Sequence, residues 1–302
     1  MKVIVPVKRV PDTAGEKKID PDTKTVDRES VESVLCPINE FSIEEAMRLK
    51  ENQGAEVTAL LMGPDSAQPI VRKALSYGLD AGIQITDEPI AGSDALGTAK
   101  VIAKALENEE FDLVIFGNQS TDARTCLVPA AVAEILGLPS LTYARHLEVD
   151  GDKVVVHREH EEGWDVVESS LPAVVSVVEA INEPRYPSFK GIMAAKSKPL
   201  DVKSAGDIGV DASQVGKDAA AAVLQGFEPR PPKEAGTIVE DDGSCKVYRL
   251  SDEHRVERRP GLFGQLKSAF GPQAVEDEHG DRTFGGDEEQ PAWKRRREPA
   301  PA

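Results

Sequence analysis

The residues with the clearest chemical potential form one polar run directly after a strongly apolar segment, 112–116. Gly117 allows close approach of a backbone, and the hydroxyls and amides that follow can donate hydrogen bonds to a phosphate or a ribose. The same run could equally be an ordinary loop in which Asp122 caps the next helix. A nucleotide site and a plain connecting loop therefore both stay open at this point. The run consists of Gly117, Asn118, Gln119, Ser120, Thr121 and Asp122.

The sequence contains none of the common catalytic or phosphate-binding motifs. GxSxG, GxxxxGK[ST] and a GxGxxG after a strand are all absent, which argues against a self-sufficient ATP site. Cys36, Cys126 and Cys245 are widely spaced, and the five histidines follow no metal-ligand pattern, so neither a disulfide framework nor a metal site is predicted. We expect a protein without catalytic residues of its own.

The net charge excludes two classes of binding partner. The chain of 302 residues carries a formal net charge of −17, which repels nucleic-acid phosphates and anionic lipid. No apolar run approaches the roughly 20 residues of a membrane span, and the N-terminal apolar run is too short and too charged for a signal peptide. We therefore expect a cytoplasmic protein that inserts into no membrane and binds no nucleic acid.

Strand and helix patterns alternate through the first half of the chain. This order predicts an α/β fold with a doubly wound, mostly parallel, Rossmann-like sheet of the adenine-nucleotide-binding kind. Ligands of such sheets bind beyond the carboxyl ends of the strands, so the loops after residues 7, 61 and 116 should form the site. The predicted strands are 3–7, 56–61, 82–86 and 112–116, and the predicted helices are 39–52, 65–77 (capped by Asp65), 95–107 (opened by Ser93 and Asp94) and 127–136.

The second half follows a different pattern. The strand-like runs 141–149 and 153–159 are joined by Asp150-Gly151-Asp152, which predicts an added antiparallel hairpin. Further strands are predicted at 164–168 and 173–178. Segment 182–199 begins with two prolines and contains a possible short helix, 190–196. So long a mixed segment on a compact domain is typical of a protruding functional loop.

Several stretches together resemble one known family. VPVKRVPD (5–12), INEFSIEEAMRLK (38–50), DLVIFGNQSTD (112–122) and NEPRYPSFKGIMAAKSKP (182–199) occur in the order and spacing of electron transfer flavoprotein beta subunits. The resemblance covers roughly residues 1–243. The last of these stretches is the most specific, because neither fold nor composition would require it.

The resemblance implies a heterodimer with an alpha subunit that holds most of an FAD, while the beta subunit holds an AMP. Such a protein is an electron carrier and no enzyme: it takes electrons from flavin dehydrogenases, such as acyl-CoA dehydrogenases, and passes them to a quinone oxidoreductase. The expected organisation is a nucleotide-binding domain, 1–225, a C-terminal arm that contacts the partner subunit, 226–258, and a disordered charged tail, 259–302.

The family's functional positions can be transferred to this sequence. The recognition loop for dehydrogenases would be 182–199, with Phe189 at the position of the apolar anchor. Its contact residues would be Asn182, Glu183, Pro184, Arg185, Tyr186, Phe189, Ile192 and Met193. The AMP pocket would comprise Pro6, Cys36, Pro37, Ile38, Asn39, Met62, Gly117, Asn118, Gln119, Ser120, Thr121, Asp122, Arg124, Thr125, Cys126, Leu127 and Val128.

One departure from the family pattern keeps alternatives open. Where well-known members carry Asn-Gln-Thr against the AMP phosphate, this chain has Cys126-Leu127-Val128. Ser120, Thr121, Arg124, Thr125 or backbone N–H groups would have to replace those donors. The alternatives are an electron-bifurcating subunit with a second FAD in place of AMP, a stand-alone adenine-nucleotide-binding protein, and a scaffold with a vestigial pocket.

Overall fold

The computed structural model describes residues 1–15, 18–228, 231, 246–248 and 255–257 of the chain. These residues belong to two units. The first unit, Met1–Glu228, holds the sheet and helices described below, and the second is Pro229–Ala302. Within the second unit, the short strands β12 (Lys246–Tyr248) and β13 (Arg255–Glu257) pair antiparallel, with Val247 opposite Val256. Of the predicted arm (226–258), residues 226–228, 231, 246–248 and 255–257 are described, and the rest of the arm and the predicted tail (259–302) lie outside the described residues.

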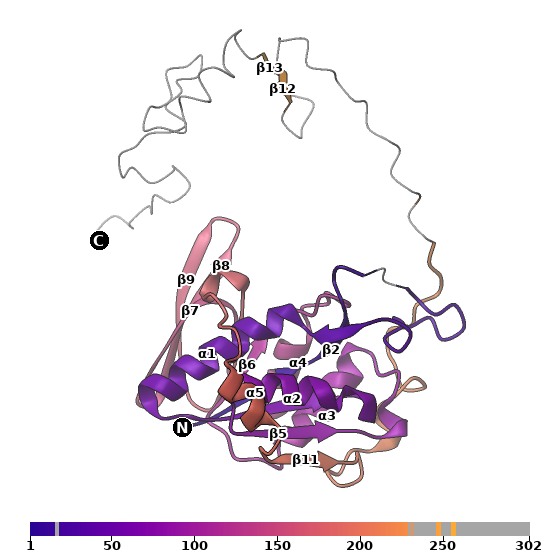
Figure 1. Cartoon of the computed structure of the whole chain (residues 1–302), viewed down its shortest axis with the longest axis horizontal. Coiled ribbons are helices and arrows are strands. Elements are labelled where there is room, and N and C mark those ends of the chain that lie inside the picture. Colours follow the sequence, from indigo (N-terminus) through magenta and orange to yellow (C-terminus); the bar gives the residue numbers. More distant parts are fainter. Residues whose placement is uncertain (16–17, 229–230, 232–245, 249–254, 258–302) are drawn as a thin grey trace. The chain divides into compact units, whose positions relative to one another are not determined.

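One nine-stranded sheet organises the first unit (Figure 1). Its order is β11 (Leu200–Lys203), β5 (Ala81–Ile85), β4 (Glu56–Met62), β1 (Lys2–Val7), β6 (Leu113–Gly117), β10 (Ala173–Val177), β7 (Ser140–Asp150), β8 (Lys153–His160) and β9 (Gly163–Ser170). Neighbours from β11 to β7 pair parallel, and β7, β8 and β9 pair antiparallel. The predicted α/β class with a mostly parallel sheet is confirmed.

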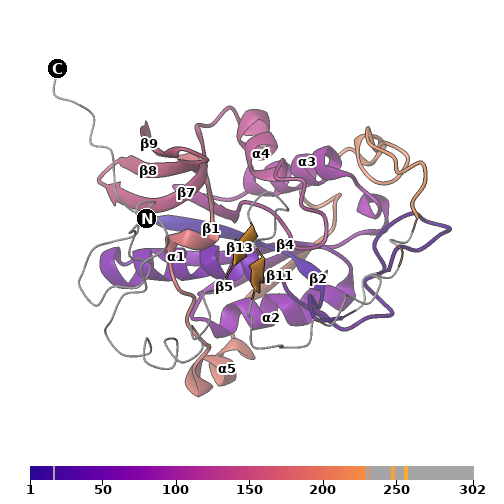
Figure 2. The same ribbon diagram turned by 90° about the horizontal axis from the view of Figure 1, so that it is seen from above.

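The side chains of the central strands alternate between two cores. On β1, Val3 and Val5 enter a core with α1 (Pro37–Gln53) and α2 (Gln68–Ser76), whereas Ile4 enters a second core with α3 (Ala95–Leu106) and α4 (Val128–Leu136). Figure 2 shows the strands between these two helix pairs. Because both faces are covered, strands 57–61 and 112–116 are apolar at nearly every position, as their sequences predicted.

The helices end where the sequence provides the right residues. α3 is capped by Asp94, whose carboxylate accepts a hydrogen bond from the Gly97 N–H at 2.8 Å. α1 and α4 each stop at a glycine in the left-handed conformation, Gly54 at φ 70° and Gly137 at φ 65°. The predicted helix boundaries near residues 95 and 137 are therefore confirmed.

Two details differ from the sequence predictions. Asp65 does not cap α2: a 3-10 turn, Asp65–Ala67, precedes that helix, and the Asp65 carboxylate accepts a hydrogen bond from the Thr86 hydroxyl at 3.0 Å. The short strands β2 (Arg9–Pro11), β3 (Ser33–Leu35) and β11 were not predicted. Strands of three or four residues carry too little periodicity to be recognised.

The antiparallel hairpin forms where it was predicted, with Gly151 at φ 60° in its turn. Its first strand, β7, also pairs parallel with β10, so the hairpin extends the main sheet. Strand β9 lies at the sheet edge, and the β8–β9 end projects from the body of the first unit (Figure 1). The predicted short helix is α5 (Phe189–Ala195), which packs beside α2 (Figure 2).

Candidate functional site

A cavity of about 470 Å³ opens at the carboxyl ends of β1, β4 and β6. At this point the chain order reverses, because β4 and β5 lie on one side of β1 and β6 lies on the other. Loops that follow neighbouring parallel strands diverge at such a point and leave a crevice. The loops after residues 7, 61 and 116 all reach the cavity wall, as predicted. We call this cavity the strand-end cavity.

The wall of the strand-end cavity has an apolar part and a polar part. The apolar part comes from strand ends, helix α3 and the 3-10 turn before it, and includes Leu60, Met62, Ile90, Ile102 and Phe116. An apolar wall of this kind suits the face of a planar ring. The polar part includes Lys8, Arg9, Arg28, Asn118, Ser120 and Thr125. The cavity can therefore receive a ligand with one flat apolar end and one anionic end.

Asp122 joins two of the cations at the polar part. Its side chain is fully buried, and it accepts hydrogen bonds from Lys8 Nζ at 2.8 Å and from Arg28 Nε at 2.9 Å. Lys8 Nζ also donates to the Ser120 hydroxyl at 3.1 Å. Burial alone would raise the pKa of Asp122, but the charges and hydrogen bonds of these partners outweigh it and lower the pKa to about 2. Burial lowers the pKa of Lys8, although the Asp122 charge opposes this shift.

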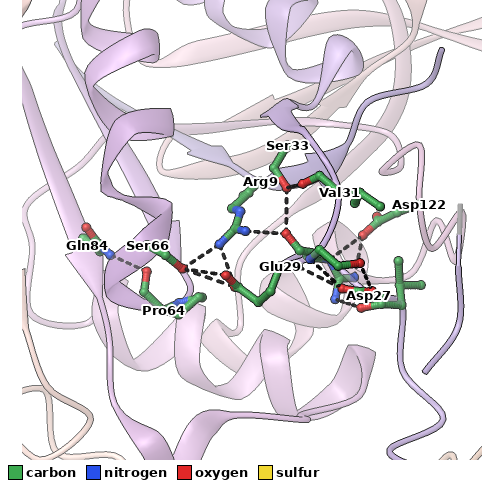
Figure 3. A network of polar contacts seen from close by, with 12 residues as sticks. Arg9, Asp27, Glu29, Val31, Ser33, Pro64, Ser66, Gln84 and Asp122 are labelled. Carbon is green, nitrogen blue, oxygen red and sulfur yellow. Dashed lines mark hydrogen bonds and ion pairs between the residues drawn. The ribbon is translucent and has the colours of Figure 1, made fainter. Parts of the chain in front are cut away.

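A second ionic contact ties the segment 12–32 to the rim of the cavity. Arg9 donates to the Glu29 carboxylate at 2.9 Å and to the Ser66 hydroxyl at 2.7 Å (Figure 3). The Arg9 side chain is only 11% exposed, and its hydrogen bond to Glu29 lowers the pKa of that carboxyl. Arg28 and Glu29 are neighbours in sequence, so the segment is held at two adjacent points, to Asp122 and to Arg9. Arg28 is thereby fixed at the cavity wall.

The loop 117–128 supplies further donors and acceptors. The amide oxygen of Asn118 is buried and has no hydrogen-bond partner among the residues that the structure describes, although Asn118 lines the cavity. Helix α4 begins at the cavity wall without a side-chain cap, so its first N–H groups can donate to an anion. Arg124 and Cys126 hold the loop in left-handed conformations, at φ 50° and 54°.

The strand-end cavity brings together most of the residues predicted for the pocket. Six of them do not line it. Cys36 and Ile38 are buried in a small core with Val10, Pro37 starts α1, and Arg124 is exposed. Asp122 acts behind the wall through Lys8 and Arg28, and Thr121 lies outside the wall as well. Those that line the cavity are Pro6, Asn39, Met62, Gly117, Asn118, Gln119, Ser120, Thr125, Cys126, Leu127 and Val128.

Sequence reasoning missed the cations at the wall. Lys8, Arg9 and Arg28 were not predicted as site residues, yet all three line the cavity. Lys8 and Arg9 directly follow β1, whose end was predicted to matter, so their place in the sequence was a usable signal. Arg28 carries no such signal, because it meets Asp122 from 94 positions away.

The predicted recognition loop exposes its large apolar side chains. Tyr186 is 95% and Phe189 80% exposed, and Ile192 and Met193 are about half exposed. Asn182 and Arg185 instead turn toward α1, where Asn182 donates to the Phe41 carbonyl at 3.0 Å and Arg185 to Glu44 at 2.7 Å. Glu183 is exposed and Pro184 is half-buried. Within the loop 182–199, one set of residues thus faces solvent and another set faces the protein.

The residues of the strand-end cavity fit an adenine nucleotide. The unpartnered Asn118 oxygen is an acceptor for an amine such as that of adenine, and the apolar wall suits the ring. Lys8, Arg28 and the start of α4 can bind phosphate. The carboxylates at the wall are already engaged: Glu29 with Arg9, Asp94 with the Gly97 N–H, and Asp87 with the Ala205 N–H at 3.1 Å.

Within the described residues, no three His, Cys, Asp or Glu side chains come together as a metal site. The helices in that part of the chain are also too short or too polar to cross a membrane.

Comparisons with known proteins place the chain in one family. A family model described as an electron transfer flavoprotein domain matches residues 23–208. The chain is 44% identical over 247 residues to the electron transfer flavoprotein subunit beta of Mycobacterium tuberculosis (strain CDC 1551 / Oshkosh), which covers 80% of this chain and 93% of that protein.

Two more distant relatives span nearly the same region. The electron transfer flavoprotein subunit beta of Megasphaera elsdenii is 36% identical, over 86% of this chain and 99% of its own length. The caffeyl-CoA reductase-Etf complex subunit CarD of Acetobacterium woodii is 35% identical, over 85% of this chain and 100% of its own length.

Proposed function

The chain belongs to the electron transfer flavoprotein family as a beta subunit, and from that premise we propose that it forms one half of a heterodimeric electron carrier whose strand-end cavity binds an adenine nucleotide. The alpha subunit would hold most of the FAD. A flavin, when bound, supplies reversible uptake and release of electrons, and the protein supplies binding and orientation. The beta chain contributes no catalytic residues in this proposal.

The observation that carries the proposal is the polar part of the cavity. Asp122 is fully buried and is held by Lys8 and Arg28, so both cations are fixed at the wall. Both cations stay about one third exposed, so two fixed cations and an uncapped helix start at the same cavity wall are suited to a phosphate. The nucleotide proposed here is AMP, because a single phosphate suffices to engage these donors.

A second candidate is an electron-bifurcating subunit in which the cavity binds a second FAD. One observation favours it: the relative of Acetobacterium woodii is a subunit of a caffeyl-CoA reductase-Etf complex. The loss of the Asn-Gln-Thr run at Cys126-Leu127-Val128 is compatible with either ligand, because backbone donors at the start of α4 serve any phosphate.

We further propose that the loop 182–199 docks onto flavin dehydrogenases, and we call it the docking loop. Phe189 is the proposed anchor, because a highly exposed aromatic ring on an ordered segment is typical of a binding hot spot. A quinone oxidoreductase is the proposed electron acceptor. We also propose a cytoplasmic location, and membership of the family is its only support.

Co-expression with the alpha subunit tests the proposal. The copurified heterodimer is denatured, and the released ligands are separated by chromatography and counted per heterodimer. One FAD and one AMP are expected. Two FAD and no AMP would support the bifurcating candidate, and a beta chain that never copurifies with a flavin-containing partner would refute both.

A further inference from the structure

The docking loop is attached to the body of the protein by polar contacts at its two ends, while the apolar side chains between them face solvent. An ordered segment that exposes large apolar side chains needs some other source of order, because Tyr186 and Phe189 contribute little buried area. The contacts at the two ends identify that source.

The first attachment is Arg185. Its Nε and one terminal nitrogen donate to the two oxygens of Glu44 at 2.7 and 3.1 Å, and its backbone N–H donates to Glu44 at 3.2 Å. The same guanidinium also reaches both oxygens of Glu51, one of them at 3.0 Å. Glu44 is only 7% exposed, whereas Glu51 is 52% exposed. Two carboxylates two turns apart on α1 therefore fix one guanidinium through paired hydrogen bonds, the geometry in which arginine binds most specifically.

The second attachment is made by α2. Arg72 donates to the carbonyls of Ala195 and Lys198 at 2.9 and 2.6 Å, and Lys198 Nζ donates back to the Leu75 carbonyl at 3.1 Å. Gly191 lies against the end of the same helix: a Cβ at this position would stand 2.3 Å from the Ser76 carbonyl oxygen. Only glycine permits α5 to approach α2 this closely.

We infer that Arg185 is a positioning residue, which holds Phe189 and its apolar neighbours in a preformed docking surface by fixing the docking loop to Glu44 and Glu51. This inference rests on the proposed function, because an ordered loop aids binding only if the loop docks onto a dehydrogenase. A preformed loop loses less conformational entropy when a partner binds than a loop that must first become ordered. Arg185, although predicted as a contact residue, would act through the loop and not by touching the partner.

The test uses the copurified heterodimer with Arg185→Ala, Arg185→Lys and Phe189→Ala. Backbone amide exchange over residues 186–195 is measured alongside the steady-state reduction of the flavin by an acyl-CoA dehydrogenase. For Arg185→Ala we expect exchange to rise and kcat/KM for reduction to fall, each roughly tenfold, through KM and with unchanged flavin content. Arg185→Lys keeps the charge but loses the paired geometry, so it should restore only part of both effects.

Lys153→Ala serves as the matched control, because it removes another cation from an ion pair, the exposed pair with Glu168 on the β8–β9 hairpin. It should change neither the amide exchange of residues 186–195 nor the reduction of the flavin. If Arg185→Ala does not fold, Glu51→Gln takes its place, since it removes only the more exposed carboxylate.

The results distinguish the docking proposal from the positioning role of Arg185. Wild-type exchange in Arg185→Ala would overturn the positioning role. If Phe189→Ala leaves reduction unchanged while Arg185→Ala speeds exchange, the docking proposal fails and the attachment stands. If Phe189→Ala slows reduction and Arg185→Ala changes nothing, the docking proposal stands and the inference fails.

Discussion

At the strand-end cavity, the buried carboxylate of Asp122 fixes Lys8 and Arg28, and these cations form part of the wall. At the docking loop, the nearly buried carboxylate of Glu44 fixes Arg185, and the neighbouring aromatic rings face solvent. Both regions use one buried acid to hold basic side chains. In our proposal, the held cations of the cavity are themselves the binding groups, whereas the held cation of the loop supports apolar binding groups.

This difference predicts different consequences when the acid–base contact is lost. In the cavity, loss should affect both folding and nucleotide binding, because the Asp122 carboxylate is fully buried and the proposed ligand contacts the cations that it holds. In the loop, loss should affect docking and should affect folding less, because Glu44 keeps Arg48 as a partner at 3.5 Å and Glu51 is half exposed.

Replacing Asp122 by Ala should have the largest effect on stability. Removal of one partner from a buried ion pair typically costs about 3–5 kcal/mol, and the partial exposure of Lys8 and Arg28 reduces this to about 2 kcal/mol. The thermal midpoint of the heterodimer should fall by about 6 °C. Glu110→Gln, which removes the acid of an exposed pair with Lys2, is the control and should leave the midpoint unchanged. Equal midpoints for the two variants would show that Asp122 is not a stabilising centre.

In the wild-type protein, the contribution of Asp122 to stability should depend on pH. Because the pKa of Asp122 in the folded chain is about 2, below its ordinary value of about 3.9, the carboxylate stabilises the fold above pH 4. This contribution, about 2 kcal/mol, should be lost as the pH falls from 4 to 2, with about half gone at pH 3. Urea unfolding at pH 5 and pH 3 measures it. Asp122→Asn should lose less stability over this range than the wild type, and an identical loss would contradict the assignment.

Replacing Asp94, which lies at the rim of the cavity, should have a smaller effect on stability than replacing Asp122. Its carboxylate caps α3 and also accepts a hydrogen bond from the Ala222 N–H at 3.0 Å. Asp94→Ala should cost about 1 kcal/mol in urea unfolding. Asp94→Ser retains a capping oxygen and should recover most of that loss, and no recovery would show that the cap is not the reason.

The docking loop should show the smallest stability effect. Phe189 is 80% exposed, so Phe189→Ser should change the free energy of unfolding by less than about 0.5 kcal/mol. A control with a comparable apolar residue in the core, Ile115→Ser, should be strongly destabilising, because Ile115 is fully buried. A large loss of stability in Phe189→Ser would mean that the ring packs on the protein and is not available as an anchor.

The sequence predicted the sheet well because its central strands are covered on both faces, and a short continuous apolar run such as 112–116 is typical of a strand buried in this way. It predicted the loop after that strand as a site because strand ends are where such folds bind ligands. It left open whether Asp122 caps the next helix or belongs to the pocket, because Asp122 binds Lys8 and Arg28, which are 114 and 94 positions away and give no local signal. It likewise gave no sign that Arg185 faces inward, because that depends on Glu44 and Glu51 sharing one side of a distant helix.

Nucleotide content tests the central claim most directly, namely that the cavity binds the nucleotide and the loop has a separate task. The heterodimer is purified as wild type, Arg28→Ala and Arg185→Ala, and the AMP or additional FAD released on denaturation is counted. Wild type and Arg185→Ala should release the same amount, and Arg28→Ala should release much less, because it lacks a cation at the cavity wall. Full retention by Arg28→Ala, or loss from Arg185→Ala, would contradict the account.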